Sequence, residues 1–192
     1  MKRSLGVQAS VFPMPVLMVS TYDAQGVVNV MNMAWGNMYD DTQVLLNLEP
    51  SHKTTANIKL RGAFTLSIAD ASHVAESDYL GIVSGNRVPD KFARTGLTAV
   101  KSENVDAPVV QEYPVTMECK VVEIIENPTC THVVGQIVNV LADESVIGDN
   151  GKVDPTKLNA LIFDTFQHGY YVPGEKVGQA WKSGGVFLKD QE

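Results

Sequence analysis

Three residues whose side chains suit a phosphate group stand together where a helical pattern begins. Ser51, Lys53 and Thr54 follow Pro50, which ends an apolar run because proline cannot donate to a strand ladder. Ser51 is a favourable N-cap, and the free amides of a first helical turn attract anions. The pattern predicts a phosphate site, although an ordinary capped helix after a hairpin explains the same residues.

A second segment has the composition of a wall for a flat ligand. The strand-like residues that begin at Val28 give way to Asn32, Met33, Ala34 and Trp35, a run too irregular for a plain strand. Small residues let a ligand approach the backbone closely, and an indole can form one side of a cleft. We predict that Asn32 to Trp35 border such a ligand.

Two further positions could complete this site. Ser84 and Gly85 form a loop that permits close backbone approach, and Lys91 supplies a compact cation on a flexible stem. A surface turn anchored by Phe92 explains these residues as well. His132, on a predicted strand, could lie over a ligand or at a subunit interface, or be a structural hydrogen-bonded residue.

Hydrophobic periodicity predicts many short strands and few helices. The predicted strands are 15–21, 28–33, 44–48, 63–68, 115–125 and 132–141, and the predicted helices are 51–61, 72–80 and a short one capped by Asp90. Residues 1–13 read as an arm, 97–110 as an irregular connection, 154–155 as the start of a short helical segment, and the tail as short strands or loops. This pattern predicts a mainly β fold, a barrel with peripheral helices, in a single domain over residues 1–192.

Composition excludes several classes of function. The net charge of −7 and pI near 5.1 disfavour a general nucleic-acid or anionic-membrane binder. Export is not expected, because polar residues and prolines interrupt the segment after Lys2 and Arg3, and no window reaches the length of a membrane span. A cytoplasmic protein is therefore predicted.

The chain offers no catalytic motif of its own. The two cysteines, Cys119 and Cys130, stand in no CxxC pattern, so they read as reduced and structural, and the four histidines lack zinc-ligand spacing. A Rossmann glycine motif, a P-loop and a nucleophile elbow are all missing from the sequence. No catalytic side chain and no metal site are predicted, and any chemistry would come from a bound cofactor.

Five segments in register resemble the flavin reductase-like FMN-binding split-barrel family, and the likeness is greatest to its flavoredoxin-type members. They are Asn29–Trp35, Ser84-Gly85 with Asp90-Lys91-Phe92, Ala107-Pro108, Glu118-Cys119-Lys120 and His132–Gln136, and the tail Tyr170-Tyr171 with Gly174 and Gly178 is similar too. The resemblance covers roughly residues 13–184. Asn32 departs from it, since many members carry Thr or Ser there.

The resemblance implies a six-stranded antiparallel Greek-key split barrel that forms a homodimer, with FMN near the subunit interface. It implies that the isoalloxazine borders Asn32, Met33, Ala34 and Trp35, and that the phosphate and ribityl chain lie at Ser51, Lys53, Thr54, Ser84, Gly85 and Lys91. His132 would lie near the flavin or a nicotinamide.

The implied activity is that of a flavin reductase-type oxidoreductase. Electrons would pass from NAD(P)H through FMN to free flavin, a ferric chelate or a redox partner. An FMN electron carrier without NAD(P)H activity is the alternative, and a third possibility is a non-flavin ligand such as haem on the same barrel.

Overall fold

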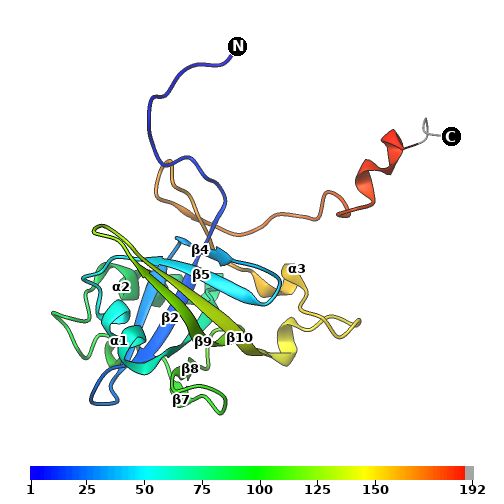
Figure 1. Cartoon of the computed structure of the whole chain (residues 1–192). Coiled ribbons are helices and arrows are strands. Elements are labelled where there is room, and N and C mark those ends of the chain that lie inside the picture. Colours follow the sequence, from blue (N-terminus) through cyan, green and yellow to red (C-terminus); the bar gives the residue numbers. More distant parts are fainter. Residues whose placement is uncertain (189–192) are drawn as a thin grey trace.

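A strongly curled antiparallel sheet forms the centre of the molecule, for which a computed structural model describes residues 1–188 (Figure 1). Its neighbouring strands run in the order β3, β2, β6, β9, β10, β5, β4. Their bounds are β2 Leu17–Tyr22, β3 Val28–Met33, β4 Gly36–Met38, β5 Gln43–Leu48, β6 Ala63–Ile68, β9 Val115–Glu126 and β10 Thr131–Ala142.

The two ends of this sheet are joined by the chain itself. β3 and β4 are the outermost strands of the order, yet only Ala34 and Trp35 separate them in sequence. The amide of Asn47 on β5 donates to the Trp35 carbonyl at 2.9 Å, which ties this corner to the neighbouring strand. Counting β3 and β4 as one bent strand turns the seven strands into six. The predicted mainly β, six-stranded antiparallel barrel is thus confirmed.

β2 is buried on both faces, as its nearly continuous apolar run predicted. Leu17 and Val19 pack inside the barrel with Phe64, whereas Met18 belongs to a second cluster on the other face, together with residues of α2 (Val74–Ile82). Gly135 on β10 lets Phe64 pack against the strand, because a Cβ there would lie 2.5 Å from the phenyl ring. β2 is therefore covered on both faces, although it is the second strand in the order of the sheet.

The two main helices occur where predicted, with two differences. α1 (Lys53–Arg61) ends at Gly62 in the left-handed conformation, but its N-cap is His52 and not Ser51. His52 makes no side-chain capping bond, so the predicted cap chemistry of Ser51 is wrong. α2 follows a 3-10 turn, η1 (Ala71–His73), and runs two residues beyond the predicted end at residue 80.

Short elements complete the structure. The connection predicted as irregular contains a two-stranded sheet, β7 (Ala99–Lys101) with β8 (Pro108–Val110). The predicted helix at Asp90 is only a 3-10 turn, η2 (Ala93–Thr95), and Asp90 pairs with Arg94 at 3.0 Å instead of capping. The remaining elements are β1 (Met14–Pro15), η3 (Glu144–Val146), α3 (Pro155–Leu158), β11 (Ile162–Phe163), β12 (Tyr170–Tyr171) and η4 (Ser183–Phe187).

Both ends of the described chain leave the barrel (Figure 1). The N-terminal arm is exposed up to Pro13, and the C-terminal arm, residues 172–188, carries fully exposed apolar side chains such as Val177 and Trp181. Within residues 1–188 no helix is long and apolar enough to cross a membrane, and no cluster of His, Cys, Asp or Glu is built to hold a metal ion. The single-domain prediction extends to residue 192, and residues 189–192 lie outside the described part.

Candidate functional site

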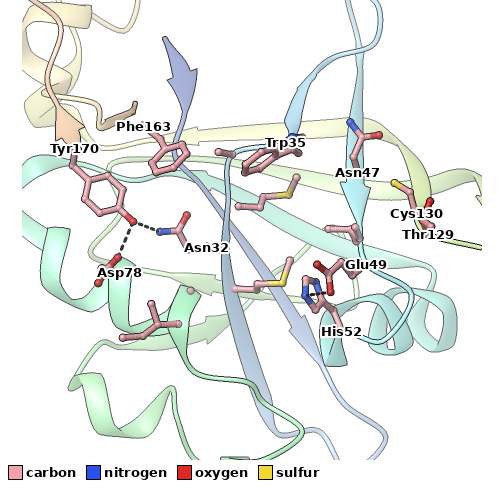
Figure 2. A pocket seen from close by; sticks show the side chains of 16 residues that line it. Asn32, Trp35, Asn47, Glu49, His52, Asp78, Thr129, Cys130, Phe163 and Tyr170 are labelled. Carbon is pink, nitrogen blue, oxygen red and sulfur yellow. Dashed lines mark hydrogen bonds and ion pairs between the residues drawn. The ribbon is translucent and has the colours of Figure 1, made fainter. Parts of the chain in front are cut away.

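A cavity of about 480 Å³ opens where the bend between β3 and β4 meets α2 and the loop before α1 (Figure 2). This volume is in the range of small-molecule and cofactor sites. Its lining residues come from five regions of the chain: Met31, Asn32, Met33, Ala34, Trp35, Asn47, Leu48, Glu49, His52, Asp78, Gly81, Ile82, Thr129, Cys130, Phe163 and Tyr170.

Aromatic and sulfur-containing side chains make most of this cavity apolar. Trp35 and Phe163 have ring centroids 6.3 Å apart, and Phe163 lies 6.1 Å from Tyr170. Met31 and Met33 reach the cavity from the barrel core, to which both belong. Polarizable methionines beside aromatic rings suit a flat conjugated ligand.

One wall of the cavity carries a hydrogen-bonded polar group. The Asn32 amide nitrogen donates to the Ser77 carbonyl at 3.0 Å and reaches the Tyr170 hydroxyl at 3.4 Å. The Tyr170 hydroxyl in turn donates to Asp78 at 2.9 Å. Burial, together with the hydrogen bond to Asp78, raises the pKa of Tyr170 to about 12, so the phenol stays protonated at neutral pH.

The opposite wall is polar as well. Glu49 and His52 lie 3.4 Å apart, and both face the cavity. His132 is not part of the lining, but its Nδ1 lies 2.5 Å from Oδ1 of Asn47 and 4.0 Å from Sγ of Cys130, which do line it. His132 therefore supports this wall from behind, and its predicted contact with a flavin or nicotinamide stays a prediction.

Two polar segments meet beside the cavity. The Asn86 side chain donates to the Ser51 carbonyl at 2.9 Å, which joins the loop at Ser84 to the residues before α1. Gly85 packs against this region, because a Cβ there would lie 3.3 Å from Cγ of Lys53. Since His52 borders the cavity, the amino end of α1 is adjacent to it. The structure thus brings the predicted segments 51–54 and 84–85 together.

Asn29 connects these segments to the barrel. Its side chain donates to the Thr54 hydroxyl at 2.9 Å, in a site where Thr54 is only 1% exposed. Lys53 is more open and lies 3.3 Å from Asp23. Burial alone would raise the pKa of Asp23, but hydrogen bonds from the Val27 and Gln25 amides and from Lys53 hold it below its ordinary value.

Lys91 lies beneath the loop and not on its surface. Its side chain is 3% exposed, and its ammonium donates to the carbonyls of Leu80 at 2.7 Å and Val83 at 2.8 Å. Burial lowers the pKa of Lys91 to about 8. The residue binds carbonyls at the C-terminal end of α2, and its contact with a phosphate stays a prediction.

Sequence patterns found part of this site and missed the rest. Asn32, Met33, Ala34 and Trp35 all line the cavity, as the irregular run suggested. The aromatic tail segments that contain Phe163 and Tyr170 were visible in the sequence, but nothing there indicated that they fold back onto β3. Asp78 had no signal at all, and Cys130, interpreted as structural, lies in the cavity wall.

Comparison with known proteins gives a consistent picture. A model of the flavin reductase-like domain matches residues 9–162. A flavoredoxin of Desulfovibrio vulgaris (Miyazaki F) is 38% identical, with a TM-score of 0.91 over 96% of this chain and 100% of that one. A putative flavin reductase with a split barrel domain from Shewanella frigidimarina shares the fold, with 21% identity and a TM-score of 0.76 over 86% of this chain and 84% of that one.

A curated relative matches in part only. An uncharacterized protein of Aeropyrum pernix is 30% identical over 115 residues, which are 58% of this chain and 44% of the relative. The chain thus spans less than half the length of this curated relative.

Proposed function

Because the chain belongs to the flavin reductase-like domain family, we propose that it binds FMN in the cavity described above and works as a flavin reductase-type oxidoreductase. Electrons would pass from NAD(P)H to free flavin, a ferric chelate or a redox partner. One observation carries the proposal: an apolar cavity of about 480 Å³ lies next to the amino end of a helix flanked by a lysine.

The residues present fit the two halves of FMN. Trp35, Phe163 and the methionines offer flat apolar surface for the ring system. The first-turn amides of α1 have no partner within the helix, so they favour an anion, and Lys53 adds a positive charge. Gly85 lets its loop pack closely against Asn29 and Lys53, which keeps the loop beside the amino end of α1.

When bound, the flavin supplies hydride and electron chemistry that no side chain of this protein could supply. The protein contributes binding, orientation and the exclusion of water. Trp35 and Phe163 would hold the ring system, Asn32 would offer it a polar contact, and Lys53 with the α1 amides would hold the phosphate. No side-chain acid or base is required of the protein in this scheme.

An electron carrier that does not oxidise NAD(P)H is the second candidate. The 38% identity to a flavoredoxin over the whole of that chain favours it. In this case a partner protein would reduce the bound flavin.

The visible spectrum tests FMN binding, and NAD(P)H oxidation separates the candidates. Flavin absorbance that stays with the protein through desalting supports both, and a protein that does not take up FMN contradicts both. Oxidation of NADH or NADPH with added FMN supports the reductase. Stoichiometric FMN with no oxidation of either nucleotide supports the carrier.

We also propose that the protein is a homodimer, and a cytoplasmic one. Support for the dimer comes from exposed apolar side chains on the C-terminal arm, including Val177, Trp181 and Phe187, which are 97%, 101% and 83% exposed. Exposed apolar surface of this extent marks interaction sites. Light scattering after gel filtration would give twice the mass of 20.9 kDa, and a monomeric mass would contradict this proposal.

A further inference from the structure

The side chain of Asn32 is held in one orientation by neighbours from two other elements. Ser77 on α2 and Tyr170 on β12 both contact the same end of the Asn32 amide. Figure 2 shows the contact with Tyr170. These two elements are far from β3 in sequence, so the arrangement exists only in the folded chain.

The chemistry of these neighbours decides which amide atom faces them. The Ser77 carbonyl can only accept a hydrogen bond. The Tyr170 hydroxyl gives its own proton to the Asp78 carboxylate at 2.9 Å, so its oxygen is left to accept. Because both neighbours need a donor, the amide nitrogen of Asn32 must face them, and its oxygen is turned away.

Close packing keeps this side chain from rotating. A Cβ at Gly81 would lie 3.1 Å from Cβ and 3.6 Å from the amide nitrogen of Asn32, so the helix backbone lies directly against it. Within residues 1–188 the Asn32 oxygen accepts no hydrogen bond from the protein. It is a fixed acceptor at the cavity wall that the fold itself does not use.

We propose that Asp78 and Tyr170 are positioning residues which, through Asn32, make this wall a hydrogen-bond acceptor for a ring N–H of the bound ligand. The inference rests on the proposed function, since the isoalloxazine ring carries such a group. The oxidised ring has an N–H at N3, and the reduced ring has a further N–H at N5. A wall that can only accept therefore selects rings with a hydrogen at one of these positions.

Two titrations distinguish N3 from N5. The first compares dissociation constants for FMN and N3-methyl FMN in the wild type and in Asn32→Leu, a substitution of similar shape. The second measures the midpoint potential of bound FMN in both proteins. A contact at N3 predicts that the wild type prefers FMN by about tenfold and that the variant loses this preference. A contact at N5 predicts that, in the variant, reduced FMN loses about tenfold in affinity relative to oxidised FMN. The midpoint potential of bound FMN would then fall by about 30 mV, as expected for a two-electron couple.

Further variants test the positioning role. Tyr170→Phe removes the hydroxyl without touching Asn32, and Asp78→Ala frees the hydroxyl to turn. Both are expected to lose part of the same preference or potential shift. Asn127→Leu, the same change at an exposed residue outside the cavity lining, is the matched control, and it should leave the FMN to N3-methyl FMN ratio and the potential unchanged.

The failure of this inference is distinct from that of the proposed function. If the wild type binds FMN but Asn32→Leu alters neither the ratio nor the potential, the acceptor role is overturned. An equal effect in the Asn127→Leu control overturns it as well. A wild type that binds no FMN removes the proposed function itself, and this inference with it.

Discussion

Two asparagines of β3, three residues apart, illustrate how the surroundings decide a side chain's role. Asn29 is 5% exposed, donates to Thr54, and has its oxygen against the backbone of Gly85. Asn32 is only partly buried, and its oxygen is free at the cavity wall. Both contact a glycine of a neighbouring element, so both are closely packed. The difference is that the Asn29 oxygen lies against Gly85 outside the cavity lining, whereas Asn32 lines the cavity.

This difference assigns the two residues to different tasks. Asn29 joins α1 and the loop at Gly85 to the barrel, so we expect it to stabilise the fold. Asn32 is fixed by α2 and Tyr170, so we expect it to affect ligand binding more than stability. The following experiments test this comparison, from the largest expected effect to the smallest.

Gly85→Ala should be the most damaging substitution. A Cβ there would lie 2.3 Å from the Asn29 oxygen, which is buried and cannot move away easily. Overpacking of this kind costs about 1–3 kcal/mol, and we expect the upper end together with loss of FMN binding. Gly81→Ala is the matched control, with its closest contact at 3.1 Å to the less buried Asn32. Urea denaturation compares the two, and an equal loss of stability would contradict the distinction.

Asn29→Ala should cost more stability than Asn32→Ala. The first leaves the Thr54 hydroxyl in a buried site without its donor, which costs about 1–3 kcal/mol. The second removes a hydrogen bond next to a cavity that water can enter, and we expect about 1 kcal/mol or less. The midpoints of chemical denaturation measure both. If Asn32→Ala cost more stability than Asn29→Ala, the structural role assigned to Asn29 would be contradicted.

Lys53→Ala should weaken FMN binding by about tenfold, because one charge near the phosphate is lost. Riboflavin, which has no phosphate, should lose little affinity in the same variant. Lys59→Ala on the same helix is the control, since Lys59 pairs with the exposed Glu126 away from the cavity. Fluorescence quenching gives the dissociation constants. An equal loss for both ligands would place the phosphate elsewhere.

Lys91, which lies beneath the loop of Ser84 and Gly85, should make the free energy of unfolding depend on pH. Its pKa in the folded protein is lowered to about 8 by burial, below the ordinary 10.5 of the unfolded chain. The unfolded state therefore binds more protons between these values, and stability rises as pH increases from about 8 towards 10.5. Relative to Lys91→Met, the wild type should gain about 1 kcal/mol between pH 8 and pH 9. If the difference in stability between the wild type and Lys91→Met does not change with pH, the ammonium is not desolvated in the folded protein.

The strands that the sequence predicted best were those with the plainest hydrophobic pattern. The runs at 17–22, 43–48 and 63–68 and the long pair β9 and β10 formed as expected, because alternating or continuous apolar residues leave few other ways to bury them. The short strands β7 and β8 were missed, since three residues carry too little periodicity to detect. His52 replaced Ser51 as the cap because the chain bends at Glu49, whose carbonyl accepts from the His52 amide at 3.1 Å.

The sequence by itself determined the barrel, the helix that begins beside Lys53, and the segment from Asn32 to Trp35 as a cavity wall. These follow from local patterns: periodicity, a proline stop and small residues in an irregular run. Only the tertiary structure decided that Asp78 and Tyr170 orient Asn32 and that Lys91 supports α2. The physical reason is that a hydrogen bond between distant segments depends on where the sheet curls, and no local pattern records that.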